Sequence, residues 1–525
     1  MNTKALRQKI LDLAIRGKLA PQDPNDEPAE VLLERIREQK QQMLKEGKLK
    51  KKDIKNDTII FKGEDNLHYE KFQDGTVKCI EDEIPFEVPE GWAWCRLNDI
   101  YNFIDYRGAT PTKTTNGIPL VTAKNVKSGY IDYTIDDYIS EEEFKERQQR
   151  GISKKGDILF TTEAPLGNAA LADIEKFSAG QRLITFQQYG SKNELINYVM
   201  LMFILSDFFQ QQLCVNKTGS TVAGIKAAIL KTLWIPVPPY NEQLRISNTL
   251  KSAVNLIDSI SQNKEILSTS ISNTKSKILD LAIRGKLVPQ DPNDEPASVL
   301  LERIRTEKEE LIKQGKIKRD KKESVIFRGD DNSYYLRTGR VEESLEDWRF
   351  DDLPETWKIC CLGELCDYGD CINVNTEDIA EDAWILDLED IEKDTGTVLK
   401  KVTKDQRNSV STKHKFHSGQ VLYSKLRPYL NKVVLSDADG YCTSEILPLE
   451  FKNCVLPEYA RYYLMSGTFI TYANHCSYGV KMPRLGTTDG KKAIFSLPPL
   501  SEQKRIVETI DFCFMQLNKI SEALA

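Results

Sequence analysis

One segment of this chain occurs twice almost unchanged. Residues 10–37 and residues 278–305 agree at all but two positions, Ala20 and Glu30 of the first copy. Such close internal repetition predicts one structural unit that is built twice. The long tracts that follow the two copies do not resemble each other. We therefore expect a shared frame that carries two different contents, as in one device that reads two things.

Two further repeated parts bracket each variable tract. One opens the tract, with Phe-Lys-Gly-Glu-Asp-Asn at residues 61–66 and Phe-Arg-Gly-Asp-Asp-Asn at 327–332. The other closes it, with Pro-Pro-Tyr-Asn-Glu-Gln at 238–243 and Pro-Pro-Leu-Ser-Glu-Gln at 498–503. Both tracts thus begin and end in the same way, whatever lies between.

A long helix is predicted after each Pro-Pro pair. Proline cannot donate to a sheet, so each pair is expected to end a strand, and Asn241 or Ser501 is expected to cap the helix. After Asn241 a four-three alternation of mainly apolar residues is typical of a coiled coil, and Gly285 fits the helix end. The positions of this seam are Ile246, Leu250, Ala253, Ile257, Ile260, Lys264, Leu267, Ile271, Thr274, Ile278 and Leu281.

The second copy of this helix is divided between the two ends of the chain. Its seam runs from Ile506 to Leu524, and Thr3 to Leu13 continue the pattern in the register of the central helix. We expect Met1 and Ala525 to adjoin, so that the ends rebuild a second helix antiparallel to the central one. Ordinary amphipathic helices that pack elsewhere are the alternative.

The order of these parts resembles the specificity subunits of type I restriction-modification systems. The resemblance covers the whole chain, and the motifs are specific in combination, although Pro-Pro-x-x-Glu-Gln alone would be weak. It implies an α+β fold in which two target-recognition domains of mixed β-sheet and helices are separated by a long antiparallel two-helix coiled-coil spacer, with a pseudo-two-fold internal repeat. Each domain would read half of a bipartite, asymmetric DNA sequence.

The same resemblance implies the partners. They are double-stranded DNA, two methyltransferase subunits that methylate adenine and, in the restricting complex, motor-nuclease subunits. S-adenosylmethionine, ATP and Mg are expected in those partner subunits and no cofactor in this chain. The domain boundaries expected from the repeats are 1–20 and 497–525 for the two parts of the distal spacer helix, 237–285 for the central spacer helix, 21–83 and 286–347 for the linkers, and 84–236 and 348–496 for the recognition domains.

The overall charge gives little direct support for DNA binding. A net charge of −6 and a pI near 5.7 are unusual for a chain that must neutralise phosphates. Positive charge must therefore be arranged locally, unless the two basic runs are plain solvated loops. These runs are Lys45, Lys48, Lys50, Lys51, Lys52 and Lys55, and their repeat Lys313, Lys316, Lys318, Arg319, Lys321 and Lys322.

Two short regions of each variable tract are candidates for DNA contact. Loops of different sequence follow matched strands at 156–160 and 419–423, and a glycine-containing turn precedes the last strand of each tract. Arg and Lys pair with guanine edges, and Asn, Ser and Thr with adenine or phosphate oxygens. Plain surface turns are the alternative. The predicted DNA-binding residues are Thr161, Thr162, Lys217, Thr218, Ser220, Ser424, Lys425, Arg427, Tyr478, Lys481 and Arg484, with Arg107, Lys113 and Lys124 as weaker candidates.

Membrane, disulfide and metal classes are disfavoured. Helices predicted at 198–214 and 459–472 read as domain cores, because their apolar runs are far shorter than a membrane span, and no signal peptide precedes them. A cytoplasmic location is therefore expected. The eleven cysteines share no spacing between the two halves, which favours buried reduced thiols over disulfides. The spacings around Cys361 and His414 do not match zinc sites.

No catalytic, cofactor-binding or metal residue is predicted. The tetrapeptide at 237–240 lacks the polar first residue of an adenine methyltransferase motif, and the segment 219–226 departs from a phosphate loop. A non-catalytic DNA-recognition subunit is the leading hypothesis. A stand-alone methyltransferase or nuclease with a diverged site, and a coiled-coil scaffold that binds only protein, stay open as alternatives.

Overall fold

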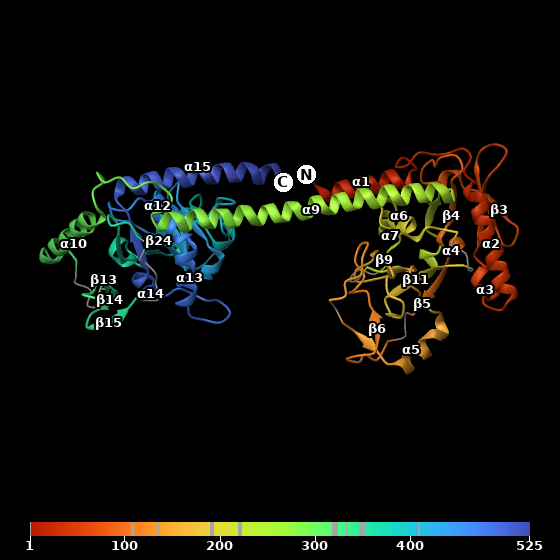
Figure 1. Cartoon of the computed structure of the whole chain (residues 1–525), viewed down its shortest axis with the longest axis horizontal. Coiled ribbons are helices and arrows are strands. Elements are labelled where there is room, and N and C mark those ends of the chain that lie inside the picture. The colour runs from red at the N-terminus through yellow and green to blue at the C-terminus, as the bar shows by residue number, and fades with distance from the viewer. Residues whose placement is uncertain are drawn as a thin grey trace. The chain divides into compact units, whose positions relative to one another are not determined.

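The computed structural model consists of two compact units, residues 1–263 and residues 264–525. A single helix, α9 (Tyr240–Ile283), passes from the first unit into the second (Figure 1). Helices and sheets are both present in each unit, as the α+β prediction requires. The structure describes residues 2–106, 110–134, 136–189, 194–218, 223–317, 324–331, 333–345, 353–407 and 410–524.

The described residues of the first unit form short helices and four small sheets. Its helices are α1 (Thr3–Ile15), α2 (Ala29–Lys45), α3 (Lys51–Ile54), α4 (Leu97–Ile100), α5 (Glu141–Arg147), α6 (Asn197–Ile204), α7 (Asp207–Asn216) and α8 (Ala227–Leu230). Its strands are β1 (Thr58–Lys62), β2 (His68–Phe72), β3 (Val77–Cys79), β4 (Ala93–Arg96), β5 (Tyr101–Asp105), β6 (Ile118–Val121), β7 (Tyr138–Ile139), β8 (Ile158–Thr161), β9 (Ala169–Leu171), β10 (Ser178–Ala179), β11 (Leu183–Gln188) and β12 (Trp234–Val237). The sheet orders are β1-β2-β3, β10-β6-β7, β5-β11-β8-β9 and β12-β4.

The second unit has a related order of elements. Its helices are α10 (Ala297–Lys313), α11 (Leu362–Leu365), α12 (Pro457–Leu464), α13 (Gly467–His475), α14 (Thr487–Lys492) and α15 (Leu500–Leu524). Its strands are β13 (Ser324–Arg328), β14 (Tyr334–Thr338), β15 (Val341–Ser344), β16 (Lys358–Cys361), β17 (Ile372–Val374), β18 (Trp384–Leu386), β19 (Val402–Thr403), β20 (Lys413–Phe416), β21 (Val421–Ser424), β22 (Val433–Leu435), β23 (Gly440–Thr443), β24 (Ile446–Leu449) and β25 (Ile494–Leu497). The sheet orders are β13-β14-β15, β16-β25, β17-β20-β23-β18-β19 and β22-β21-β24.

The strand that opens each variable tract pairs with the strand that closes it. In the first unit β4 is antiparallel to β12, and in the second β16 is antiparallel to β25. A tract of more than a hundred residues therefore leaves the frame and returns to the same place. This pairing explains why the motifs on both sides of each tract are shared while the interior differs.

The Pro-Pro pairs start the long helices differently from the prediction. Gln243 donates its backbone N–H to the carbonyl of Pro239, and Gln503 does the same to Pro499. The helices therefore begin directly after the prolines, at Tyr240 and Leu500. The prediction of Asn241 and Ser501 as N-caps is wrong. The carbonyl of the second proline already accepts the first helical hydrogen bond, and proline has no N–H group that would need a capping partner.

Shared side chains of the closing motif hold helix, tract and frame together. Glu242 accepts a hydrogen bond from the buried Trp92 indole at 2.9 Å, and Gln243 accepts from the backbone N–H of Ile196 at 2.8 Å. In the second unit Glu502 accepts from Trp357 at 3.0 Å, and Gln503 accepts from the backbone of Leu456 at 2.8 Å. The Pro-Pro-x-x-Glu-Gln motif thus has a structural role in both units.

Glycine ends the repeated helices for two reasons. Gly17 and Gly285 both have φ of +65°, a left-handed conformation that other residues adopt at a cost. A Cβ at these positions would also lie 2.3 Å from Pro89 Cγ or 2.4 Å from Pro354 Cγ. The predicted helix end near Gly285 is confirmed.

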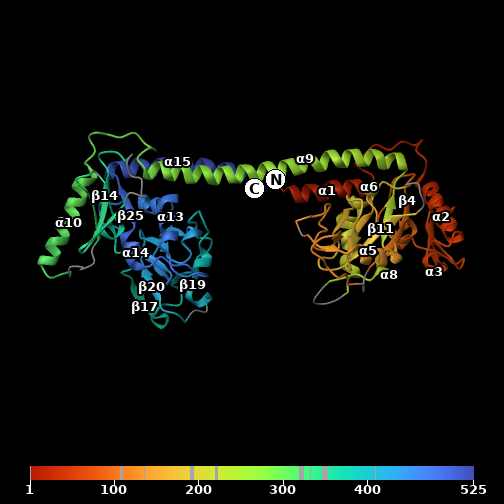
Figure 2. The ribbon, with the colours of Figure 1, turned by 60° about the horizontal axis from the view of Figure 1, so that its bottom comes forward.

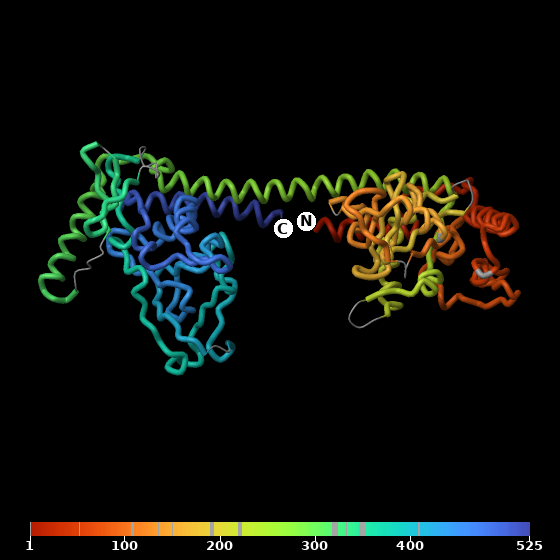
Figure 3. Tube along the Cα trace, turned by 90° about the horizontal axis from the view of Figure 1, so that it is seen from below, coloured from red at the N-terminus to blue at the C-terminus, as the bar shows by residue number. Residues whose placement is uncertain are grey.

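The terminal helices pack on α9 within their own units. In the first unit Arg7 pairs with Asp258 and Thr3 lies against Ser261, so α1 runs antiparallel to the first part of α9 (Figure 2). In the second unit α15 lies along the second part of α9 (Figure 3), and Lys275 of α9 donates to Asn518 of α15 at 2.6 Å. Met1 and Ala525 lie outside the described residues, and the prediction that they adjoin stays a prediction.

The predicted seam of α9 is correct only in part. Ile246, Leu250 and Ile257 are buried, as expected for a helix that faces a partner. Leu267 and Thr274 are exposed, so these two seam positions are wrong. Thr3, the first residue of α1, already lies against Ser261. Helix α1 therefore does not reach the seam positions of α9 that follow Ser261, although the apolar pattern continues there.

Each predicted core helix is divided into two. Helices 198–214 and 459–472 were expected, but the chain bends at Ser206 and Ser466, which cap α7 and α13. Each serine hydroxyl accepts the backbone N–H of the residue three positions later and donates to the carbonyl of the residue three positions earlier. Taken singly, the helices in the described ranges are too short or too polar to span a membrane, although the bent pair α6 and α7 meets that test of length and composition jointly.

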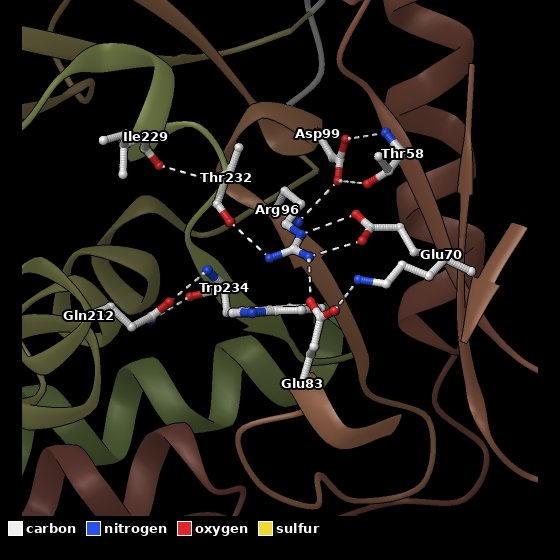
Figure 4. Close-up of polar contacts among 10 residues, drawn as sticks. Thr58, Glu70, Glu83, Arg96, Asp99, Gln212, Ile229, Thr232 and Trp234 are labelled. Carbon is white, nitrogen blue, oxygen red and sulfur yellow. Dashed lines mark hydrogen bonds and ion pairs between the residues drawn. The ribbon is translucent and has the colours of Figure 1, made fainter. Parts of the chain in front are cut away.

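In the first unit the sheet β1-β2-β3 attaches to the β12-β4 strand pair through one side chain. In the first unit Arg96 on β4 donates to both carboxylate oxygens of Glu70 on β2, at 3.1 and 2.9 Å (Figure 4). Its guanidinium lies 3.5 Å from the ring centroid of Trp234 and also donates to the carbonyl of Thr232. One side chain therefore joins the hairpin β1-β2-β3 to both strands of the β12-β4 pair.

Some of the cysteines are buried and others are exposed. Cys95, Cys360, Cys361, Cys366, Cys442 and Cys454 are buried free thiols, as predicted. Cys79 and Cys214 are exposed, so the prediction is wrong for these two. Within the described ranges, His, Cys, Asp and Glu do not gather in groups of three or more that could hold a metal ion.

Candidate DNA interface

The two predicted contact regions of the first unit lie side by side. Thr162, which follows β8, donates its N–H to the carbonyl of Arg182 at 3.1 Å and accepts from Ile225 at 3.0 Å. Thr218 and Gly224 exchange backbone hydrogen bonds at 2.8 and 3.0 Å. We call residues 162–163, 182, 218 and 224–225 the first loop cluster. It joins the strand-following loop to the glycine-containing turn.

The second unit makes the same backbone contacts. Lys425, which follows β21, donates to the carbonyl of Glu445 at 3.0 Å and accepts from Leu485 at 3.0 Å. Tyr478 and Arg484 exchange backbone hydrogen bonds at 3.1 and 3.0 Å. Residues 425–426, 445, 478 and 484–485 form the second loop cluster.

The two clusters differ in nearly every side chain although their backbones match. A strand fixed by its neighbours presents a side chain at a set place whatever its identity. The equivalent pairs, in the order first cluster and second cluster, are Thr162 and Lys425, Glu163 and Leu426, Arg182 and Glu445, Thr218 and Tyr478, and Gly224 and Arg484. Such a pair of surfaces suits recognition of two different ligands by one scaffold.

Three predicted contact residues are used inside the fold. Thr161, Thr162 and Ser424 are buried. The hydroxyl of Thr161 accepts the N–H of Asn168 at 2.9 Å, and that of Ser424 donates to the carbonyl of Leu426 at 3.0 Å. In this conformation these side chains shape the loop and do not face solvent.

The other described candidates lie at or near the surface. Lys217, Thr218, Tyr478 and Lys481 are exposed, and Lys425, Arg427 and Arg484 are half-buried. Arg427 has φ of +51° and donates its backbone N–H to Pro483 at 2.7 Å, which places it beside the second loop cluster. Ser220 and Arg107 lie outside the described residues.

The weaker candidates and the basic runs do not join the clusters. Lys113 pairs with Asp137 at 2.7 Å, and Lys124 is exposed on a separate loop. The described lysines of the basic runs are exposed, and Lys48 pairs with Glu46 at 2.7 Å. The described members with exposed side chains are Lys45, Lys48, Lys50, Lys51, Lys55, Lys313 and Lys316, while the side chain of Lys52 and residues 318, 319, 321 and 322 lie outside the description.

Ion pairs within the clusters were missed by sequence reasoning. Arg182 lies 3.1 Å from Glu163, and Arg484 lies 2.8 Å from Glu445. The hydrogen bond to Glu445 raises the pKa of Arg484, so this guanidinium is firmly cationic. The residues of each pair are 19 and 39 positions apart in sequence, and only the backbone pairing brings them together.

The strand that leads into the first cluster begins at a buried carboxyl group. Burial raises the pKa of Asp157 from 3.8 to about 6, although Lys154 and Gln187 donate to its Oδ2, both at 2.8 Å. The equivalent residue of the second unit is Gln420, which accepts the N–H of His417 at 3.0 Å. The same turn therefore carries an acid in one unit and an amide in the other.

Comparison with known proteins identifies the family. The family described as the type I restriction modification DNA specificity domain matches residues 89–268 and 354–523. The chain belongs to this family. Each match covers one variable tract, with its loop cluster, and most of the helix that follows, so the DNA specificity domain is matched once in each half of the chain.

Curated relatives of the DNA specificity family extend the likeness to the whole chain. The chain is 28% identical to the type I restriction enzyme EcoAI specificity subunit of Escherichia coli, over 98% of this chain and 90% of the relative. It is 27% identical to the EcoEI specificity subunit of Escherichia coli, over 99% and 90%. A solved structure from work on complex assembly and conformational transition of the type I R-M system matches with a TM-score of 0.52 at 16% identity, over 84% of this chain and 94% of that chain, which shows a shared fold.

Proposed function

We propose that this chain is the DNA-reading subunit of a type I restriction-modification complex and that it recognises a bipartite, asymmetric target. Each loop cluster reads one half-site. The observation that carries the proposal is the pair of loop clusters, whose backbone hydrogen bonds agree while their side chains differ. Two equal scaffolds with unequal surfaces are what two unlike half-sites require.

The chemistry of the clusters supports DNA as the ligand. Cationic and hydroxyl groups lie in or next to both clusters. Lys217 and Thr218 of the first unit and Lys481 of the second are exposed, and Lys425 of the second is half-buried. Such groups contact phosphates and base edges. The chain as a whole is acidic, so attraction to DNA is confined to local surfaces of this kind.

Helix α9 supports a role as spacer between the half-sites. It has 44 residues, which correspond to about 66 Å at 1.5 Å per residue. An unread gap of fixed length would follow from its rigidity, with α1 and α15 completing the spacer. Two methyltransferase subunits, and motor-nuclease subunits in the restricting complex, would dock on the duplicated frame and supply adenine methylation, ATP use and cleavage.

Exchange of one variable tract tests this proposal. Residues 101–231 are replaced by the corresponding tract of another member of the family, and the methylated motif of the assembled complex is sequenced before and after. We expect one half-site to change while the other half-site and the gap stay the same. A change in both half-sites, or in neither, contradicts the proposal.

A change of spacer length provides the matched control. Adding one heptad to α9, with the same addition to the distal helix, is expected to change the gap and to keep both half-sites. Methyl transfer from labelled S-adenosylmethionine to DNA by the purified chain alone would instead show an enzyme in its own right.

A further inference from the structure

We propose that each loop cluster reads a guanine through an arginine that a glutamate holds in place, Arg182 with Glu163 in the first unit and Arg484 with Glu445 in the second. This inference rests on the proposed function and names the base that each half-site must contain. The two pairs use different positions of the shared backbone. Arg182 of the first pair directly precedes strand β11, whereas Arg484 of the second pair lies in the glycine-containing turn.

The donors of Arg484 are divided between the protein and solvent. Its Nε lies 3.1 Å from both oxygens of Glu445, its Nη2 donates to Oε1 at 2.8 Å, and its Nη1 donates to the carbonyl of Met482 at 3.3 Å. A guanidinium has five N–H groups. Three of them are directed at these oxygens, which leaves one N–H group on each terminal nitrogen. The side chain keeps 32% of its surface exposed.

In the first unit Arg182 also pairs with a glutamate, through its Nε. Its Nε lies 3.1 Å from Oε1 of Glu163, and its side chain keeps 52% of its surface exposed. Its backbone carbonyl accepts the N–H of Thr162, as the carbonyl of Glu445 accepts the N–H of Lys425. The position shared by the two pairs thus holds the arginine in the first unit and the glutamate in the second, and its partner comes from the strand-following loop in the first unit and from the glycine-containing turn in the second.

Stability does not account for these pairs. Exposed ion pairs contribute little to folding, because solvent screens the charges and two side chains must be ordered. An ordered guanidinium is useful in recognition, since less freedom is lost when it binds. Two N–H groups that lie side by side in one fixed guanidinium plane match the O6 and N7 acceptors of guanine in the major groove. The glutamate fixes the plane, and the free end selects the base.

The test combines a variant with a modified base. The full chain, co-expressed with its methyltransferase partners, is first used to select a motif from a random duplex library. Affinities are then measured for wild type, Arg484→Gln and the control Lys481→Gln, whose lysine is exposed on the same turn. The duplexes carry the selected motif with guanine or with 7-deazaguanine, which lacks the N7 acceptor. Arg182→Gln and Lys217→Gln repeat the design in the first unit.

We expect Arg484→Gln to lose the preference for one G·C pair in one half-site, by about 10- to 100-fold. Replacing that guanine with 7-deazaguanine should weaken wild type and leave Arg484→Gln unchanged. Arg182→Gln should act on the other half-site, and the lysine controls should weaken binding equally for all sequences. Should a variant fail to fold, the modified duplex with wild type still decides.

Three outcomes would overturn the inference. They are a uniform loss of affinity in Arg484→Gln with an unchanged motif, selected half-sites without a G·C pair, and equal wild-type binding to guanine and 7-deazaguanine. If wild type enriches no bipartite motif at all, the proposed function fails as well, so the two failures can be told apart.

Discussion

Replacement of Asp157 by Asn is expected to stabilise the first unit above pH 6. The folded state raises the pKa of this carboxyl from 3.8 to about 6 because the group is buried. A group with a raised folded pKa holds its proton more tightly in the folded state. The loss of folding stability caused by the ionised Asp157 carboxylate is therefore absent below about pH 4, grows between pH 4 and 6, and is complete above that range.

The magnitude follows from the two pKa values. The interval from 3.8 to about 6 corresponds to about 3 kcal/mol at 1.36 kcal/mol per pH unit, which is the upper limit of the gain. Asn can accept both hydrogen bonds, since Lys154 and Gln187 donate to the same oxygen, Oδ2. The second unit already has this arrangement, with the amide of Gln420 at the equivalent place.

Urea-dependent hydrogen exchange on the full chain measures this effect locally. Peptides that cover β8 and β11 report the first unit, and peptides from β21 and β24 serve as an internal reference in the same sample. Asp157→Asn should raise the free energy of opening of β8 at pH 8, have little effect at pH 4, and leave β21 unchanged. An equal change at both pH values, or a loss of stability at pH 8, would refute the reasoning.

Three further substitutions test the packing of the frame. Gly17→Ala should unfold the first unit at lower urea than Gly47→Ala, since both glycines have positive φ but only the first has a proline ring within contact of the new methyl group; equal midpoints would contradict this. Trp92→Phe should cost about 1–3 kcal/mol and more than Trp357→Phe, because Glu242, which Trp92 binds, has no other hydrogen-bond partner among the described residues, whereas Glu502, which Trp357 binds, keeps a donor in Gln290; local opening energies in the two units decide. Arg96→Met should raise hydrogen exchange in β1, β2 and β3, and unchanged exchange there would show that the hairpin is held by other contacts.

The frame could be predicted from the sequence because it is duplicated. Gly285 ends its helix as expected, and strands at 156–160 and 419–423 are present as β8 and β21. The breaks at Ser206 and Ser466 were missed, since the apolar run continues across each serine and hides its capping role. Local pattern therefore predicted the elements but not every boundary.

The candidate site could be predicted only in outline. The register between the two halves identified the strand-following loop and the glycine-containing turn, which lie together in the structure. It did not identify Glu163 or Glu445, because their partners come from distant segments and the two pairs occupy different positions of the shared backbone. Thr161 and Ser424 were placed at the surface by their hydroxyl chemistry, but the tight turn after each strand uses those hydroxyls.

Methylome sequencing of a host with and without this chain tests the central claim most directly. We predict one methylated adenine motif that depends on the chain and consists of two short half-sites of different sequence, separated by an unread gap of fixed length. A palindromic motif, a single continuous motif, or identical methylation in both hosts would contradict the claim that two unlike reading surfaces share one frame.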